Sequence, residues 1–289
     1  MEAKVLVMGA TGPIGSNAVK RLLELNQPVR ALVHKIDDRS EALSNLGAEV
    51  VIGDMTEFNT VSSAMKGISG ALFIYPVAGG LLQATAYVAQ AAFEEKVKII
   101  VNVSQRTSVR DAPSHSAQDH WLAERLLDRS GVSVAHLRPT LFMEWLVYFA
   151  QEIKDNNHYI SPFGEASFGI IDCEDIGRSA AAILVNPEEH GGITYNLYGP
   201  EEITGHQVSD TLSKILKRKI DYDPIDPPAF GDLLRTFATP EYQVKHIVAA
   251  AQMFHSGEFR GMNHQVEFLT GTKPLSVENF INKNIKLFQ

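Results

Sequence analysis

The chain of 289 residues contains a single cysteine, Cys173, which excludes an internal disulfide. It has no Lys- or Arg-rich run and a formal net charge of −8, so a nucleic-acid-binding surface is not expected. No apolar stretch is long enough to span a bilayer, and the first expected strand begins almost at Met1, which leaves no room for a signal peptide. We therefore expect a cytoplasmic protein that binds neither nucleic acid nor membrane.

Several catalytic motifs are also missing. The sequence has no Cys-rich or His-x-x-x-His metal pattern, no Gly-x-Ser-x-Gly elbow and no Gly-Lys-Ser/Thr phosphate loop. The 10 histidines are scattered and form no spaced ligand set, so we expect no metal site. What is present is a 45% hydrophobic composition, enough to bury the core of one large α/β domain or of a domain with a smaller lobe.

The first informative motif is a glycine-rich turn at residues 9–15, which reads Gly-Ala-Thr-Gly-Pro-Ile-Gly. It follows the apolar run Val5–Met8 and precedes a helical pattern, so backbone N–H groups and the positive end of a helix dipole should surround a diphosphate. Gly9 would permit the tight turn, Gly12 would let the backbone approach the pyrophosphate, and Gly15 would let helix and strand pack closely. The motif predicts a dinucleotide site.

The residues after the second expected strand indicate which dinucleotide binds. An NAD site usually places an acidic residue there, roughly 20 residues beyond the glycines, whereas this chain has His34 and Lys35. These side chains, with Arg30 or Arg39, would attract a 2′-phosphate, which favours NADP(H) and leaves NAD(H) as the second option. The alternative is that these are solvated loop charges, since Asp37 and Asp38 follow closely.

Strand and helix patterns alternate through the first half of the chain. Apolar runs predict strands near residues 5–8, 29–33, 48–52, 70–75, 98–103 and 132–137, with helices near 56–65, 79–94 and 116–130. This alternation predicts a doubly wound, parallel Rossmann-type α/β sheet. Ligands bind outside the carboxyl ends of such strands. This rule places Gly9–Gly15, His34, Asp54, Tyr75–Gly79 and Ser104 at the rim of the site.

The pattern weakens after Pro139. We expect a Rossmann domain over residues 1–155 and a smaller C-terminal α/β substrate lobe over 156–289, with about 168–198 returning to the core. Residues 174–184 and 209–216 read as helices and 194–197 as a short strand. Residues 221–240 are rich in proline and aspartate and read as a loop with an interrupted helix.

Several motifs together resemble the NmrA-like group of atypical short-chain dehydrogenases/reductases, in the branch of the triphenylmethane and quinone reductases. Besides residues 9–15 and 29–33 they are Gly53-Asp54, Ser130-Gly131-Val132, Leu137-Arg138-Pro139, Phe142-Met143-Glu144, Asp175-Ile176-Gly177 and Tyr195-Asn196-Leu197. The resemblance covers nearly the whole chain. It implies an NAD(P)(H)-binding Rossmann domain with a small C-terminal lobe. It does not imply one activity, because the group contains both reductases and cofactor-sensing proteins.

One position departs from the wider superfamily. Its active members carry Tyr-x-x-x-Lys on the helix after the fifth strand, often with Glu four residues later. Aligning on Glu124 places Ser116 at the tyrosine position and His120 at the lysine position. A protonated His120, oriented or stabilised by Glu124 on the same helix face, could donate a proton to a substrate.

The structural alternative is that His120 and Trp121 only pack the helix onto the sheet, while Glu124 makes a surface or capping contact. The superfamily also places a small hydroxyl near the substrate carbonyl. Ser104 occupies that place, although Thr107 competes for it because the register is open.

Aromatic residues suggest walls for a flat substrate. Candidates are Tyr75, Pro76 and Val77 after the fourth strand, and Phe142, Trp145, Tyr148 and Phe149 after Pro139. The three- and four-residue spacing of the second group also fits a buried helix face. Phe142 and Trp145 are favoured because they closely follow the carboxyl end of a strand.

Together these features predict an NADPH-dependent reductase that delivers hydride to a planar electrophile, such as a quinone, an imine or iminium ion, or an enone. The alternative is a non-catalytic NAD(P)(H)-binding sensor that acts through a protein partner. The candidate cofactor-binding residues are Gly9, Thr11, Gly12, Pro13, Ile14, Gly15, His34, Lys35, Asp54, Met55, Tyr75 and Pro76. The catalytic candidates are His120, Ser116 and Ser104, and the substrate-binding candidates are Val77, Phe142 and Trp145.

Overall fold

The computed structural model describes residues 4–289, which form two compact units. The first unit comprises the chain up to Asp111 together with Ser116–Arg138 and Cys173–Asn196. The second comprises Ala112–His115, Pro139–Asp172 and Leu197–Gln289. Each unit is therefore built from segments that are separated in the sequence.

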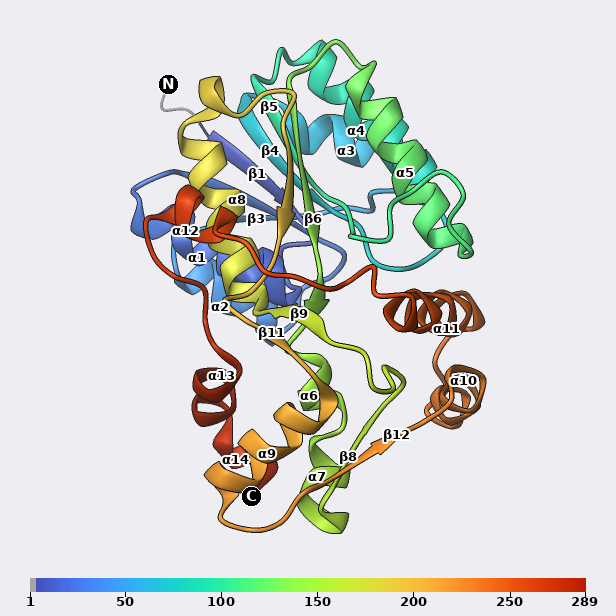
Figure 1. The fold of residues 1–289 in the computed structure, drawn as a ribbon. Helices are drawn as coiled ribbons and strands as arrows, with labels where there is room; N and C mark the ends of the chain where they lie inside the picture. Colours follow the sequence, from blue (N-terminus) through green and yellow to red (C-terminus); the bar gives the residue numbers. More distant parts are fainter. Residues whose placement is uncertain (1–3) are drawn as a thin grey trace. The chain divides into compact units, whose positions relative to one another are not determined.

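A seven-stranded sheet forms the centre of the first unit, with the strand order β10-β6-β5-β4-β1-β2-β3 (Figure 1). The strands are β1 (Lys4–Met8), β2 (Val29–Val33), β3 (Glu49–Ile52), β4 (Ile68–Ile74), β5 (Ile99–Val103), β6 (Val134–Pro139) and β10 (Thr194–Leu197). The pairs from β3 through β6 are parallel. The strand order reverses between β1 and β4, which is where such sheets bind ligands. The predicted doubly wound sheet is confirmed.

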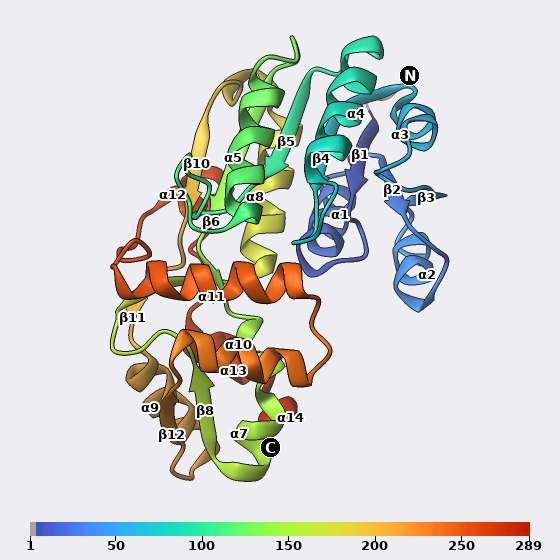
Figure 2. The ribbon, with the colours of Figure 1, turned by 90° about the vertical axis from the view of Figure 1, so that its right-hand side faces the viewer.

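Helices cover both faces of this sheet (Figure 2). They are α1 (Pro13–Glu24), α2 (Asp38–Asn45), α3 (Phe58–Met65), α4 (Leu81–Glu94), α5 (His115–Asp128) and α8 (Cys173–Val185), followed by the 3-10 helix η1 (Pro187–Glu189). Helices α3, α4 and α5 pack on one face, and α1 and α8 lie side by side on the other. The central strands β1, β2, β4, β5 and β6 are mostly buried, and all five residues of β5 are, which explains their apolar runs. The edge strand β3 has no buried residue.

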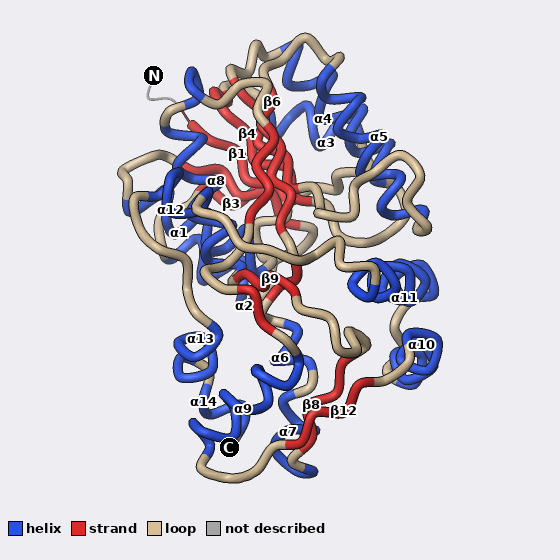
Figure 3. The backbone as a smooth tube through the Cα atoms, viewed as in Figure 1, coloured by secondary structure: helices blue, strands red, loops and turns tan. Residues whose placement is uncertain are grey.

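The second unit has two small sheets, one of three strands in the order β11-β9-β7 and one that pairs β12 with β8 (Figure 3). Its elements are β7 (Leu141–Phe142), α6 (Trp145–Tyr148), α7 (Ala150–Asn156), β8 (His158–Ser161), β9 (Phe168–Ile171), β11 (Glu202–Ile203), α9 (Gly205–Leu216), β12 (Asp221–Pro224), α10 (Pro227–Thr236), α11 (Glu241–His255), α12 (Gln265–Thr270), α13 (Val277–Lys283) and α14 (Ile285–Phe288). The core includes stacked phenylalanines, with the Phe254 and Phe259 rings 3.8 Å apart.

The interpretation of residues 221–240 as a loop with an interrupted helix is wrong for most of that segment. Residues 221–224 form β12, in which Tyr222 is buried while the flanking aspartates are only half-buried, so one face is polar. Residues 227–236 form the continuous helix α10, because the two prolines sit in its first turn, where a missing N–H group breaks no intrahelical bond.

Candidate functional site

The glycine turn connects β1 to α1 in the way that its sequence predicts. Gly9 has a φ of +76°, which favours glycine, and its carbonyl accepts a hydrogen bond from Gly12 N at 3.1 Å. A Cβ added to Gly15 would lie 2.2 Å from Gly9 O, so only glycine lets the helix start this close to the turn.

Gly12 is the N-cap of α1 and, unlike Gly15, has room for a side chain. A Cβ there would have only Gly9 O within 4 Å, at 3.4 Å. Pro13 has no N–H, and the next amides, of Ile14 and Gly15, lie in the first turn, where N–H groups lack intrahelical partners. Thr11 is half-buried beside them. Open space beside a glycine at a helix N-terminus fits the close approach of a diphosphate.

The cationic side chains near the end of β2 are not equivalent. His34 Nδ1 lies 3.8 Å from Asp54 Oδ2, and Arg39 pairs with Asp37 at 2.6 Å. Lys35 is exposed and has no ion-pair partner among residues 4–289. It is therefore the cation at this strand end that is best placed to meet an added phosphate.

Arg30, which the sequence offered as another phosphate ligand, is committed to the fold. Its Nε lies 3.1 Å from Glu49, and its Nη1 donates to the carbonyls of Ala64 and Lys66 at 2.8 Å. Arg30 is the second residue of β2 and so lies near the amino end of that strand. Parallel sheets bind ligands at the opposite end, which explains why this expectation was wrong.

The loop after β3 is held by local hydrogen bonds. Asp54 Oδ1 accepts from the amide and hydroxyl of Thr56 at 2.8 and 2.7 Å, and these bonds keep the pKa of the Asp54 carboxyl low. The neighbouring Met55 is half-buried and packs against the apolar cluster between the sheet and α3–α5. Asp54 and Met55 thus have a fixed backbone at the carboxyl end of β3.

The loop after β4 is braced by Tyr75. Its hydroxyl donates to Gly79 O at 2.8 Å, and a Cβ on Gly80, whose φ is +98°, would lie 2.7 Å from that hydroxyl. Burial and the charge of Asp54 raise the pKa of Tyr75, so this phenol stays protonated at neutral pH. Pro76 is exposed and Val77 half-buried between these fixed points.

The three catalytic candidates gather at the corner between β5 and α5. Ser104 directly follows β5, and Ser116 and His120 lie one turn apart on α5; they are 4%, 3% and 5% exposed. Gln105 connects the loop to the helix by donating to Ser116 O at 3.3 Å. The predicted helix face is therefore the buried one.

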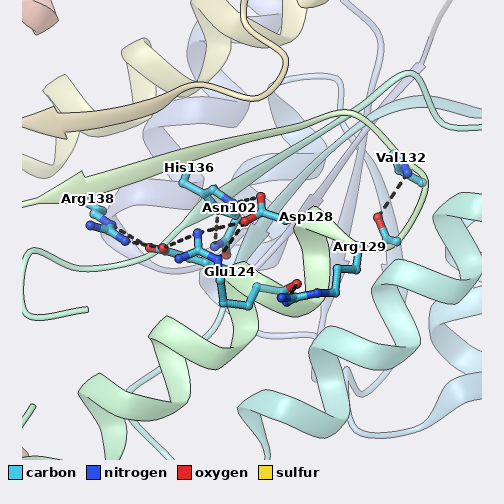
Figure 4. Close-up of polar contacts among 9 residues, drawn as sticks. Asn102, Glu124, Asp128, Arg129, Val132, His136 and Arg138 are labelled. Carbon is cyan, nitrogen blue, oxygen red and sulfur yellow. Dashed lines mark hydrogen bonds and ion pairs between the residues drawn. The ribbon is translucent and has the colours of Figure 1, made fainter. Parts of the chain in front are cut away.

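Glu124 continues that face and is fully buried, so the alternative of a surface or capping contact is wrong. Arg138, at the end of β6, donates from Nε to Glu124 Oε1 at 2.8 Å and from Nη2 to Oε2 (Figure 4). Burial raises the pKa of the Glu124 carboxyl, but the hydrogen bonds and the charge of Arg138 oppose it, and the pKa stays below its usual value. Glu124 is thus an anion at neutral pH, with Arg138 as its counter-ion.

A second polar chain lies beside this pair in Figure 4. Asn102 Nδ2 lies 3.1 Å from His136 Nδ1, and His136 Nε2 lies 3.0 Å from Asp128 Oδ1. These contacts connect β5, β6 and the last turn of α5. The residue spacing did not predict Arg138 and His136 at this corner; the available signal was the presence of polar residues within the otherwise apolar run of β6.

Phe142 and Trp145 belong to the second unit. Phe142 is half-buried in β7, and Trp145 starts α6. The Trp145 ring stacks on Phe149, with centroids 6.4 Å apart, and Phe149 packs against Phe230. Phe149 thus lies in a buried cluster, while Trp145 is half-buried at its edge and Tyr148 is 77% exposed.

All the cofactor-binding and catalytic candidates therefore lie in the first unit, around the carboxyl ends of β1 to β5. Within residues 4–289, no group of three or more His, Cys, Asp or Glu side chains could hold a metal ion. No helix in the described chain is both long enough and apolar enough to cross a membrane.

Known proteins are similar to this chain in sequence and in fold. An NAD(P)H azoreductase from Xenophilus azovorans is 31% identical over 221 residues, which cover 75% of this chain and 76% of that protein. An NADPH-dependent quinone oxidoreductase from Escherichia coli, solved with NADPH, has a TM-score of 0.86 and 21% identity, covering 97% of this chain and 99% of its own. The triphenylmethane reductase of Citrobacter sp., solved with NADP(H), has a TM-score of 0.84 and 20% identity, covering 96% and 99%.

The two structures share the fold of this chain, and the azoreductase shares sequence over most of it. The NmrA-like family matches residues 1–282, nearly the whole sequence. The expected resemblance is confirmed, and the chain belongs to the NmrA-like family.

Proposed function

We propose that the protein is an NADPH-dependent reductase that delivers hydride to a planar electrophilic small molecule: a quinone, an imine or iminium ion, or an enone. The observation that carries the proposal is the turn at Gly9–Gly15, where Gly12 caps α1 beside open space. The azoreductase relative and the two reductases of the same fold support this reaction class.

The residues present fit the cofactor. The amides of Ile14 and Gly15 would hold the diphosphate at the N-terminus of α1, and Lys35 would meet a 2′-phosphate. Asp54, Met55, Tyr75 and Pro76, on the braced loops after β3 and β4, would border the nucleoside, with His34 beside them. Bound NADPH supplies a hydride from its nicotinamide ring.

The protein's own contribution is placement and exclusion of water. A quinone or iminium ion is already electrophilic, so it needs no strong acid before hydride arrives, and holding the reactants together lowers much of the barrier. Ser104, Ser116 and His120 would position the substrate at the β5–α5 corner, and His120 would donate a proton where one is needed. Within the first unit, Val77 would contact the flat substrate. The division into a Rossmann domain over 1–155 and a substrate lobe over most of 156–289 stays a proposal.

The test is to mix the purified protein with NADPH and a panel of quinones, imines and enones, and to follow oxidation of the cofactor. Gly12→Ala is the matched variant, since the added methyl group leaves the fold intact but occupies the space beside the turn. We expect it to weaken NADPH binding by about tenfold or more, measured by calorimetry. No turnover across the panel would contradict the reductase, and undiminished NADPH binding by Gly12→Ala would contradict the cofactor site.

A second function is supported by Ser116 and His120, which alignment on Glu124 places at the positions where active members of the superfamily carry Tyr and Lys. It is a non-catalytic sensor that binds NADP(H) or NAD(H) and changes its affinity for a protein partner. Under this hypothesis, capture of a partner depends on the oxidation state of the added cofactor. A partner bound equally with NADPH, with NADP⁺ and without cofactor would count against it.

A further inference from the structure

Adjacent residues in the loop after β5, Thr107 and Ser108, both carry buried hydroxyls without a partner among residues 4–289, as does Ser104 at the end of the strand. Thr107 and Ser108 are 3% and 0% exposed. By contrast, the buried hydroxyls of Thr85 and Ser179 each donate to a backbone carbonyl of their own helix at 2.7 Å. A buried hydroxyl without a partner costs free energy, so two of them in adjacent residues are unusual in a folded protein.

The position of this pair suggests a role for it. The amide of Ser108 donates to Gln105 O at 3.0 Å, and the Gln105 side chain donates to Ser116 O at 3.3 Å. This short loop therefore joins the carboxyl end of β5 to the first turn of α5, where the catalytic candidates lie. Thr107 and Ser108 thus lie in the loop that runs from Ser104 to the start of the helix that carries Ser116 and His120.

We propose that Thr107 and Ser108 form a proton relay that passes a proton from solvent water to the substrate, in place of the proton that the missing tyrosine would have given. This proposal rests on the proposed reductase function. A hydroxyl can accept a proton on its oxygen while releasing the one it carries, so it transfers a proton without a change in its own charge. Unlike an acid, it needs no particular pKa.

The balance of the reaction defines when a relay is needed. A quinone takes a hydride, which brings two electrons, and its remaining oxyanion then takes one proton, so quinone, NADPH and H⁺ give hydroquinone and NADP⁺. A triarylmethyl cation takes the hydride at its central carbon and becomes neutral without any proton. Only the first substrate depends on the relay.

The experiment compares Thr107→Val and Ser108→Ala with the control variants Thr85→Val and Ser179→Ala, using a quinone and a triarylmethyl cation as substrates. We expect both loop variants to reduce kcat for the quinone by about tenfold or more. With the cation, kcat of both loop variants should stay within about twofold of the original value. The control variants should change kcat for neither substrate.

Thermal unfolding without substrate gives a readout that does not depend on turnover. Because Thr107→Val removes an unsatisfied polar group, it should leave Tm unchanged or raise it by about 2–4 °C, whereas Thr85→Val loses a hydrogen bond and should lower it. A drop in Tm for Thr107→Val equal to that of Thr85→Val would show a structural partner for the hydroxyl and overturn the relay.

The two proposals fail in different ways. If neither substrate oxidises NADPH in the original protein, the reductase function itself is wrong. If both substrates react but the loop variants slow them equally, or slow neither, the reductase stands and the relay is wrong. A high-resolution structure should show an ordered water or a substrate atom within hydrogen-bond distance of both hydroxyls, and hydroxyls turned to backbone carbonyls would contradict the proposal.

Discussion

At the scale of single residues, Glu124 and Arg138 form an ion pair in which the Glu124 side chain is fully buried and the Arg138 side chain is 18% exposed. Removing one partner leaves a charge with little access to water, which usually costs about 3–5 kcal/mol. The partial exposure of Arg138 favours the lower end of that range. Glu124→Gln should therefore destabilise the fold by about 3 kcal/mol in urea unfolding.

This loss should depend on pH in a defined direction. The pKa of Glu124 is lowered in the folded protein, so its contribution is present above the pKa of the unfolded chain and disappears as pH falls through the folded value. The difference between Glu124→Gln and the original should be constant near neutrality and shrink below about pH 4.5. Replacing both partners by leucine should recover part of the stability, and a double variant worse than the single one would contradict the ion-pair argument.

Lys35 tests the choice of cofactor at the same scale. Because it has no ion-pair partner in residues 4–289 while Arg39 is held by Asp37, we expect Lys35→Ala to weaken NADPH binding by about tenfold, as loss of a charge-assisted bond does. NADH lacks the 2′-phosphate, so its Kd should not change. Calorimetry with both cofactors measures this, with Arg39→Ala as the control. Equal weakening of both cofactors would argue against phosphate recognition by Lys35.

At the scale of elements, α1 and α8 approach closely because α8 has a glycine at their contact. A Cβ on Gly177 would lie 2.8 Å from both Ala18 N and Ile14 O, which are backbone atoms of α1. Alanine favours a helix over glycine by about 1 kcal/mol, yet the overlap forces the helices apart. We expect Gly177→Ala to lower stability by about 1–3 kcal/mol, as overpacking does.

Gly79→Ala is the matched control for this substitution, since a Cβ there meets nothing within 4 Å. Denaturant unfolding of both variants should show a loss only for Gly177→Ala. If Gly177→Ala is as stable as the original, the two helices adjust without cost and the close-packing argument does not hold.

The elements also show what the sequence can and cannot predict. The bounds of strands inside the sheet could be predicted almost to the residue, as for β2, which was expected and observed at Val29–Val33. A short, mostly apolar run bounded by polar residues is typical of a strand inside a parallel sheet. The paired β8 and β12 were not found, since β12 alternates Asp221 and Asp223 with Tyr222 and is too short for its period to stand out.

The candidate site, too, was predictable from the sequence only in part. The face carrying Ser116, His120 and Glu124 follows from four-residue spacing, whereas the partner of Glu124 does not. Arg138 lies 14 residues further along the chain in a different element, and only the packing of α5 against β6 brings the two together. The lack of partners at Thr107 and Ser108, within the described residues 4–289, is likewise a tertiary property.

At the scale of the whole molecule, the chain passes repeatedly between its units, and Cys173–Asn196 returns to the first unit after the second has begun. This segment contains α8, which packs on α1 behind the glycine turn. The first unit therefore requires residues from both halves of the sequence, and a cut after residue 155 would remove one of its helices.

The net charge of −8 also acts at this scale, through the approach of substrates. A negative protein attracts a cation from solution and repels an anion, and added salt screens both effects, with a Debye length near 10 Å at about 0.1 M. At saturating NADPH we expect kcat/KM for a cationic triarylmethane dye to fall several-fold between about 20 and 300 mM salt, while a neutral quinone serves as the control and stays constant. A sulfonated acceptor should show the opposite trend. Parallel changes for all three would mean that salt acts on the folded protein or on the cofactor, because steering by net charge must follow the sign of the substrate.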